Sequence, residues 1–266
     1  MALPLRDDST AERAPIVTWA LIVANVVVFL LLQPPVFQSG ALDTGATSAD
    51  PARQRAVAEE HVNQWGVIPC EVRRLEPLVS EPEGCDRGTR LSAVPDEKHV
   101  PLSLLTHMFL HGGVIHLVGN MFFLWLFGKN VEDRLGHAAF LGLYVVTGIL
   151  AMLGHVAANL TDAVPAVGAS GAVSGVMGAY VIFHPHTRIL TLVPNLVFQV
   201  VYLPAYVLLG LYFVLQFFTP DIAQVAWVAH VAGMVAGGLL ALAVEQRSRL
   251  RRASPQRPDA AREVPV

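Results

Sequence analysis

Six apolar runs, separated by polar connections, constrain the fold of this 266-residue chain more than any other feature. A helix that rises 1.5 Å per residue needs about 20 residues to cross a hydrocarbon core about 30 Å thick, so the fourth and fifth runs are short. Only 15% of the residues are charged and 53% are hydrophobic, whereas soluble domains carry about 25% charge. We therefore predict an all-α membrane protein with six transmembrane helices. The runs are Ile16–Leu32, Leu102–Gly128, Ala138–Asn159, Gly168–Phe183, Leu203–Phe218 and Val225–Val244.

The distribution of positive charge predicts how these helices are oriented. Short connections on the cytoplasmic side of a membrane are enriched in Lys and Arg. The connections 160–167 and 219–224 contain neither residue, which places them outside, and the long segment 33–101 then lies outside with them. The basic residues of the other short connections and of the tail are Lys129, Arg134, Arg188, Arg247, Arg249, Arg251 and Arg252. We expect a multi-pass protein of the cell (plasma or inner) membrane with both termini in the cytoplasm.

The chain divides into three parts on this basis. Residues 1–15 form a cytoplasmic N-terminal segment, and residues 16–246 form the six-helix domain, whose first exoplasmic loop, 33–101, is long. Residues 247–266 form a basic cytoplasmic tail, rich in Arg, Pro and Ala, that we expect to be disordered. The lipid bilayer is the expected surrounding, and the net charge of -3 argues against nucleic acid as a partner.

Two polar residues, Ser170 and His230, stand near the starts of the fourth and sixth runs. Polar groups at bilayer depth are expensive and usually mark function. Counted from the cytoplasmic helix ends, Ser170 lies about 21 Å and His230 about 22 Å above that side. A serine and a histidine are also the smallest pair that performs nucleophilic acyl transfer, one attacking and one accepting its proton. These two residues therefore predict a serine protease that works inside the membrane.

Glycine pairs predict which helices touch. Gly171 and Gly175 follow Ser170, and Gly233 and Gly237 follow His230. Small residues four apart let membrane helices approach closely, so packing of the fourth helix on the sixth would bring Ser170 toward His230. Either pair alone is also explained by helix packing without any catalytic role.

His116 and Asn120 are four residues apart on the second helix and so share one face. His116 lies about 20 Å and Asn120 about 14 Å above the cytoplasmic side. Both side chains can donate hydrogen bonds, and such donors stabilise the oxyanion that develops during acyl transfer. The alternative is a pair of interhelical hydrogen bonds, worth about 0.6 kcal/mol each.

Taken together, these motifs resemble the rhomboid family of intramembrane serine proteases, and the resemblance covers about residues 15–245. The stretches His116–Asn120, Gly168–Gly171 and Ala229–Gly233 occur in the family's order on the second, fourth and sixth helices. Further similarity is found at His107, His111, Glu132-Asp133-Arg134-Leu135-Gly136 and Trp65-Gly66-Val67-Ile68-Pro69.

The resemblance implies a catalytic dyad with Ser170 as nucleophile and His230 as general base, and with no acidic third member. His116, Asn120 and the Ser170 backbone N–H would form the oxyanion hole. It also implies substrates that are transmembrane segments of other proteins, with no cofactor and no metal. Many relatives have an aromatic residue four positions after the nucleophile, where this chain has Ser174.

Other sites and other functions agree less well with the sequence. Ser174 is a second candidate nucleophile, but it lies one helical turn deeper. The sequence lacks the H-E-x-x-H pattern of a zinc protease.

A catalytically inactive rhomboid-like protein that binds transmembrane clients is the main alternative function. A transporter or proton path would need an acidic partner within the helices. Four further histidines, His137, His155, His184 and His186, are expected to be structural or interfacial.

Cys70 and Cys85 are the two cysteines of the chain, and both fall in the segment 33–101. An oxidising exterior favours a disulfide between them. Closing a loop of about 15 residues stabilises the fold by roughly 3 kcal/mol in the chain-entropy account. Two free thiols are the alternative.

Overall fold

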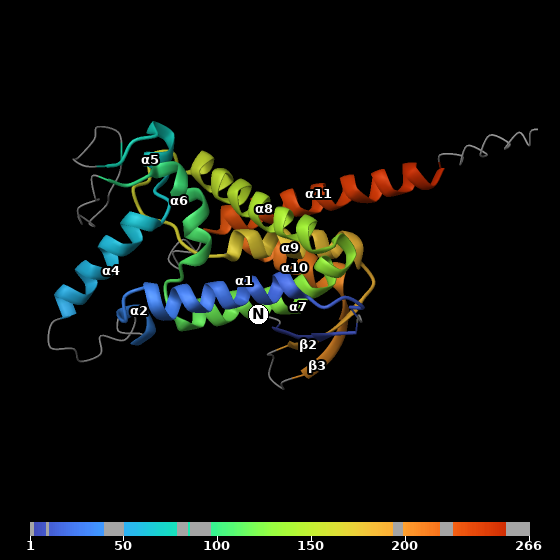
Figure 1. Cartoon of the computed structure of the whole chain (residues 1–266). Helices are drawn as coiled ribbons and strands as arrows, with labels where there is room; N and C mark the ends of the chain where they lie inside the picture. Colours follow the sequence, from blue (N-terminus) through green and yellow to red (C-terminus); the bar gives the residue numbers. More distant parts are fainter. Residues whose placement is uncertain are drawn as a thin grey trace, which may run out of the picture.

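The computed structural model describes residues 3–8, 11–39, 51–78, 85, 97–193, 199–218 and 226–253. Its long helices run in broadly similar directions, with α4, α5 and α6 at one end and a small sheet at the other (Figure 1). The elements are β1 (Leu3–Asp7), α1 (Ile16–Val27), η1 (Val28–Leu32), α2 (Val36–Ser39), α4 (Pro51–Trp65), α5 (Pro69–Arg74), α6 (Val100–Thr106), η2 (His107–Phe109), α7 (Val114–Leu135), α8 (His137–Ala158), α9 (Ser170–Phe183), β2 (Arg188–Val193), β3 (Gln199–Pro204), α10 (Ala205–Gln216) and α11 (Trp227–Ala253).

Apolar helices dominate the described part of the chain. By length and composition, α7, α8 and α11 could each cross a membrane. The apolar segment formed by α1 and η1, and the helices α9 and α10, are shorter. Each of the six predicted runs therefore contains a helix, which agrees with a mostly helical membrane protein, while six crossings of the bilayer stay a prediction.

The apolar run Leu102–Gly128 does not form one continuous helix. The structure divides this run into α6, the short 3₁₀ helix η2 and α7, with a non-helical break at 110–113. Gln33 supports the break, because its side-chain amide donates to His111 O and accepts from His111 N, both at 2.9 Å. Gly112 and Gly113 disfavour helix here, and the buried Gln33 amide takes over backbone hydrogen bonds that a continuous helix would have made.

A three-stranded antiparallel sheet, in the order β1-β2-β3, is an addition to the predicted all-α fold. Leu3 pairs with Leu192 in β2, and Arg188 pairs with Pro204, which directly precedes α10. The sequence of β2 contains β-branched Ile, Thr and Val, which suits a strand. Strand β1 comes from the segment before α1, which was predicted only as a cytoplasmic terminus.

Asp7 ties this sheet to the ends of two helices. Its carboxylate lies 2.9 Å from Lys129 Nζ and accepts a 3.0 Å hydrogen bond from the Tyr180 hydroxyl. It also accepts a hydrogen bond from the side chain of Asn130. The N-terminal strand is thereby anchored to both α7 and α9.

A second buried carboxylate, Glu132 of α7, fixes the start of α1. It accepts hydrogen bonds from the backbone N–H groups of Val17 and Thr18, both at 2.8 Å, and from the Thr18 hydroxyl at 2.6 Å. His137 Nδ1 lies 2.6 Å from the same carboxylate. The first N–H groups of a helix lack partners within it and favour negative charge, so Glu132 acts as a cap supplied by another helix.

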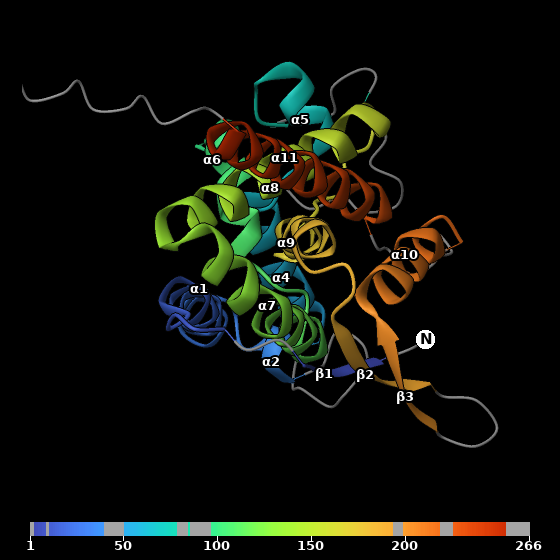
Figure 2. The same cartoon turned by 90° about the vertical axis from the view of Figure 1, so that its right-hand side faces the viewer.

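Helix α9 occupies the centre of the bundle, with α7, α8, α10 and α11 around it (Figure 2). Every residue of the stretch Gly171–Tyr180 is buried. A Cβ added at Gly233 would overlap Gly171 O, and one added at Gly237 would overlap Gly175 O. The backbones of α9 and α11 therefore touch directly, which only glycine at positions 233 and 237 permits.

At the opposite end from the sheet, the first long connection forms a small buried cluster. Val67 pairs with Ala166 in an antiparallel bridge, which joins this connection to the loop that precedes α9. Lys98 Nζ lies 2.5 Å from the Glu71 carboxylate, and both side chains are fully buried. Burial lowers the pKa of the Lys98 ammonium, and the charge of Glu71 opposes this shift.

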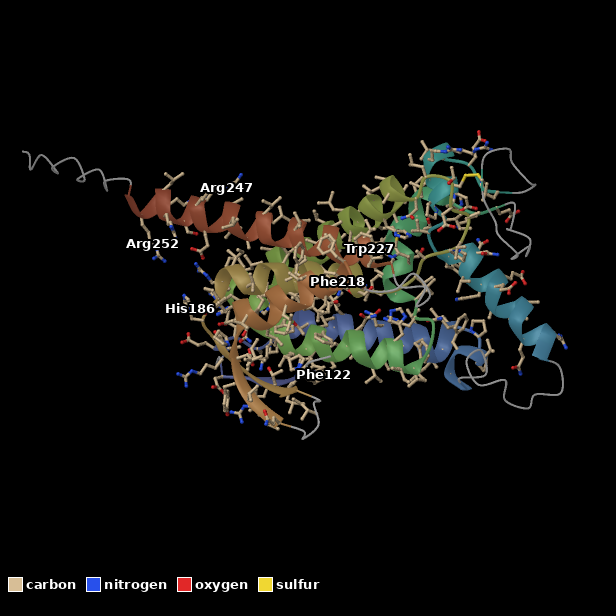
Figure 3. All side chains as sticks on the ribbon, turned by 180° about the vertical axis from the view of Figure 1, so that it is seen from behind. Phe122, His186, Phe218, Trp227, Arg247 and Arg252 are labelled. Carbon is tan, nitrogen blue, oxygen red and sulfur yellow. A yellow bond between two sulfur atoms is a disulfide. The ribbon has the colours of Figure 1, made fainter. Side chains whose placement is uncertain are left out.

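The structure joins Cys70 to Cys85 by a disulfide in the same region. Figure 3 shows this bond at one end of the molecule, while Arg247 and Arg252 of α11 and His186 lie at the other. The predicted exoplasmic and cytoplasmic features thus separate to opposite ends.

Helix α11 continues to Ala253, beyond the predicted domain end at residue 246. Ala, Glu, Gln and Arg are good helix formers, and the first proline after the apolar run is Pro255. Residues 247–253, which were expected to belong to a disordered tail, are therefore helical. The rest of the tail, 254–266, and the connection Thr219–Gln224 with Asp221 lie outside the described residues.

The glycine contact generates the first testable prediction. We expect Gly237→Ala to destabilise the bundle by about 1–3 kcal/mol, since the new methyl group meets a backbone oxygen that moves only if the helices separate. Denaturant unfolding in mixed micelles measures the difference. Gly142→Ala on α8 is the matched control, because a Cβ there meets nothing within 4 Å. Equal stability of the two variants would contradict close packing of α9 on α11.

Candidate active site

Ser170 is the first residue of α9, and the preceding loop holds it in place. Gly168 is buried and has a φ of 130°, a conformation that residues with side chains rarely adopt. Its N–H donates a 2.8 Å hydrogen bond to His107 O in η2. Because Ser170 begins the helix, its own N–H and that of Gly171 belong to the first turn, whose N–H groups have no intrahelical acceptor. These N–H groups and the positive end of the helix dipole therefore surround the Ser170 side chain.

His230, near the start of α11, faces Ser170 across the glycine contact. Its Nε2 lies 2.8 Å from Ser170 Oγ, although the two residues are 60 positions apart in the sequence. The His230 side chain is buried, whereas Ser170 keeps partial exposure. A nucleophile within hydrogen-bond distance of a base is the geometry that general-base activation needs.

Gln216, the last residue of α10, binds the other nitrogen of His230. Its Oε1 lies 3.0 Å from His230 Nδ1. An amide oxygen only accepts, so Nδ1 carries the proton and Nε2 presents its lone pair to the Ser170 hydroxyl. Gln216 is not among the residues predicted from the sequence, although a lone amide inside the apolar run Leu203–Phe218 is a visible signal.

His116 of α7 approaches the same point from the other side of the loop. A Cβ added at Gly168 would lie 2.9 Å from His116 Nε2 and 3.7 Å from Ser170 Oγ. The His116 ring and the Ser170 hydroxyl therefore both lie beside Gly168. Gly112 N donates to His116 Nδ1 at 3.4 Å. Nδ1 is therefore the acceptor, and in the neutral ring the proton is on Nε2, which faces the Gly168 turn.

Asn120 lies one helical turn below His116 and is 7% exposed. Its Nδ2 has no hydrogen-bond partner among the described residues. A buried amide donor without a partner is costly, so a ligand oxygen at this position would satisfy it. The structure thus gathers Ser170, His230 and His116 around one point, with Asn120 adjoining His116 on the same face.

Five other histidines have partners of their own or lie in the core. His107 and His111 are buried, and the His111 ring packs edge-on against His116 with centroids 5.2 Å apart. His155 Nδ1 lies 3.3 Å from Asn159, and the rings of His184 and His186 contact Tyr180 and Tyr206. Within the described residues, no group of three or more His, Cys, Asp or Glu side chains is arranged to hold a metal ion.

Ser174, the second candidate nucleophile, is separated from this centre. It lies one turn further along α9, is 1% exposed, and interacts with the side chain of Tyr212 from α10. No aromatic side chain occupies position 174, but Tyr212 brings one to the same level from a neighbouring helix.

Comparison with known proteins identifies the family. The chain matches the Rhomboid domain over residues 98–247, which is more than half of its 266 residues, and so belongs to the rhomboid family. The match contains α7 to most of α11 and hence all the residues gathered at the site.

Three curated relatives illustrate the similarity. Rhomboid protein 1, mitochondrial, of Saccharomyces cerevisiae is 35% identical over 96 residues, 35% of this chain and 28% of the relative. Rhomboid protease GluP of Bacillus subtilis is 41% identical over 76 residues, 29% of this chain and 14% of the relative. Presenilin-associated rhomboid-like protein A, mitochondrial, of Danio rerio is 32% identical over 108 residues, 40% of this chain and 28% of the relative. The chain spans less than a third of the length of each of these relatives.

Proposed function

We propose that this rhomboid-family protein is an intramembrane serine endopeptidase that cleaves transmembrane segments of other membrane proteins. The observation that carries the proposal is the 2.8 Å distance between Ser170 Oγ and His230 Nε2, on helices embedded in an apolar bundle. The name of the relative GluP, a rhomboid protease, supports the same class of activity.

In the first half-reaction, His230 Nε2 accepts the Ser170 proton as Oγ attacks the carbonyl carbon of the scissile bond. The carbonyl oxygen becomes an oxyanion, and the donors available to it are His116 Nε2–H, Asn120 Nδ2–H and the Ser170 backbone N–H. When the C–N bond breaks, protonated His230 gives its proton to the leaving amine. The acyl group then remains on Ser170.

In the second half-reaction, water attacks the acyl carbon while His230 accepts one of its protons. The ester bond breaks, His230 returns the proton to Ser170 Oγ, and the new carboxylic acid leaves and ionises in water. Water must therefore reach Ser170, and its partial exposure near the outer end of the bundle supports this requirement.

The substrate must present an unwound segment, because the carbonyl groups of an intact helix are hydrogen-bonded within it. Small or helix-breaking residues near the scissile bond would favour local unwinding. We propose single-pass proteins whose transmembrane segments contain such residues as the substrate class.

We further propose that both termini lie on the cytoplasmic side of the cell membrane. The basic end with Arg247 and Arg252 and the disulfide end lie apart in Figure 3, which supports a cytoplasmic and an exoplasmic side respectively. Two of the relatives carry mitochondrial names, so an organellar membrane with the basic end on the inner side is the alternative location.

A labelling experiment tests the activity against the alternative of an inactive client-binding protein. A fluorophosphonate probe should label the purified protein at Ser170, because His230 activates that hydroxyl. Ser170→Ala and His230→Ala should each abolish labelling, and Ser174→Ala should retain it. Peptide mapping by mass spectrometry identifies the modified residue. Labelling that persists in folded Ser170→Ala would contradict the proposed nucleophile, and a wild-type protein that does not label would favour the binding role.

Asn120 supplies a separate prediction about the oxyanion. Asn120→Ala should lower kcat about 10- to 1,000-fold while binding of substrate changes little, since one oxyanion donor contributes about 2.7–4 kcal/mol at most and other donors remain. Kinetics with a fluorogenic transmembrane peptide in proteoliposomes measures the effect. Gly119→Ala is the neighbouring control, because a Cβ there meets nothing within 4 Å. If kcat is unchanged in Asn120→Ala, the Asn120 side chain has only a structural role.

A further inference from the structure

We propose that Gln216 is a positioning residue for His230, holding the imidazole in the tautomer that activates Ser170, and that Tyr212 and Ser174 hold Gln216 in turn. This inference rests on the proposed function and adds a further helix, α10, to a site otherwise built from α7, α9 and α11.

The first argument is the geometry at His230. Gln216 Oε1 lies 3.0 Å from Nδ1, while Ser170 Oγ lies 2.8 Å from Nε2, so the two ring nitrogens have separate partners on opposite sides. A neutral imidazole has one donor and one acceptor nitrogen. Without a partner at Nδ1, the proton could occupy Nε2 instead, and that form cannot accept the Ser170 proton. Gln216 favours the tautomer with the proton on Nδ1, because the Gln216 amide oxygen accepts a hydrogen bond from that N–H.

The second argument is the burial of Gln216. The residue is 4% exposed although it ends an apolar helix, whose neighbouring Phe217 is exposed. Burying an amide without hydrogen bonds is unfavourable, so a glutamine is tolerated here only if its polar atoms have partners. His230 supplies one partner, and the Tyr212 hydroxyl interacts with the Gln216 side chain as well.

The third argument is the connection back to α9. Tyr212 and Gln216 are four residues apart and share one face of α10. The Tyr212 hydroxyl also interacts with Ser174, which lies one turn from Ser170 on α9. The small hydroxyl of Ser174 thus meets an aromatic residue from α10. A polar series, Ser174–Tyr212–Gln216–His230, thus joins three helices beside the nucleophile.

The test compares Gln216→Leu with Gln216→Glu in proteoliposomes, using a fluorogenic transmembrane peptide. Gln216→Leu removes the acceptor, so kcat should fall about 10- to 100-fold, the loss seen when the partner that orients a metal-bound histidine is removed, while KM changes little. Gln216→Glu keeps an acceptor, so it should restore much of kcat. Gly210→Ala on the same helix, where a Cβ meets nothing within 4 Å, should behave as wild type.

The pH profile of activity is the second measurement, because it would not change if Gln216 had only a structural role. Wild-type activity should fall on acidification, because His230 accepts a proton only when neutral. With Gln216→Glu the acid limb should shift to higher pH, since a carboxylate favours the protonated imidazole. The other titratable groups that act on His230 are His116 of α7 and His155 of α8, and both remain unchanged in every variant.

Tyr212→Phe tests the second link of the series. It should lower kcat by a few-fold in the wild type, and it should have no additional effect in Gln216→Leu, because coupled residues are non-additive. Full additivity would contradict the proposed link between Tyr212 and Gln216.

The outcomes separate this inference from the proposed function. If Ser170 and His230 are required for cleavage, but Gln216→Leu keeps wild-type kcat and Gln216→Glu keeps the wild-type acid limb, the positioning role is wrong and the protease assignment stands. If Gln216→Leu does not fold, the acid limb of Gln216→Glu decides alone. If folded Ser170→Ala still cleaves, the proposed function itself is wrong.

Discussion

The direct contact between the backbones of α9 and α11 is the constraint on which the site depends. Lipid tails provide no hydrophobic driving force for helix association, so close packing of small residues must supply it. A Cβ at Gly233 or Gly237 of α11 would overlap the backbone of Gly171 or Gly175 of α9. Ser170 directly precedes the first glycine of α9, so this contact sets the distance at which His230 reaches it.

Polar side chains from outside this contact then hold the surrounding elements in place. Glu132 caps the start of α1, and Gln33 satisfies the backbone where the second apolar run breaks. Both bind backbone groups that have no partner within a regular helix. The break allows α7 to begin at Val114, two residues before His116, beside the turn at Gly168. The non-helical segment thus places His116, the proposed oxyanion donor, next to Ser170, the proposed nucleophile.

Ser170 and His230, the proposed dyad, can be chosen from the sequence because polar residues are rare in apolar runs, and helical rise gives their depth. Gly171-x-x-x-Gly175 and Gly233-x-x-x-Gly237 similarly indicate the two helices that touch. Gly112 and Gly113 are a local signal for the break at 110–113, but its hydrogen bonds to Gln33 cannot be foreseen, since Gln33 is distant in the sequence. The β-sheet is equally hidden because β1 pairs with β2 across most of the chain length, and no local pattern reports such a pairing. Gln216 is not predicted because the resemblance implies a dyad without a third member, and its contact with His230 depends on how α10 packs beside α11.

The most direct measurement is the position of the bond that the protein cleaves. A single-pass protein with a helix-destabilised transmembrane segment should be incubated with the purified protein in proteoliposomes in ¹⁸O-labelled water, and its fragments analysed by mass spectrometry. The account predicts one new carboxyl terminus within the transmembrane segment, labelled with ¹⁸O, and none with Ser170→Ala. Intact substrate with the wild-type protein, or the same fragments with folded Ser170→Ala, would contradict it.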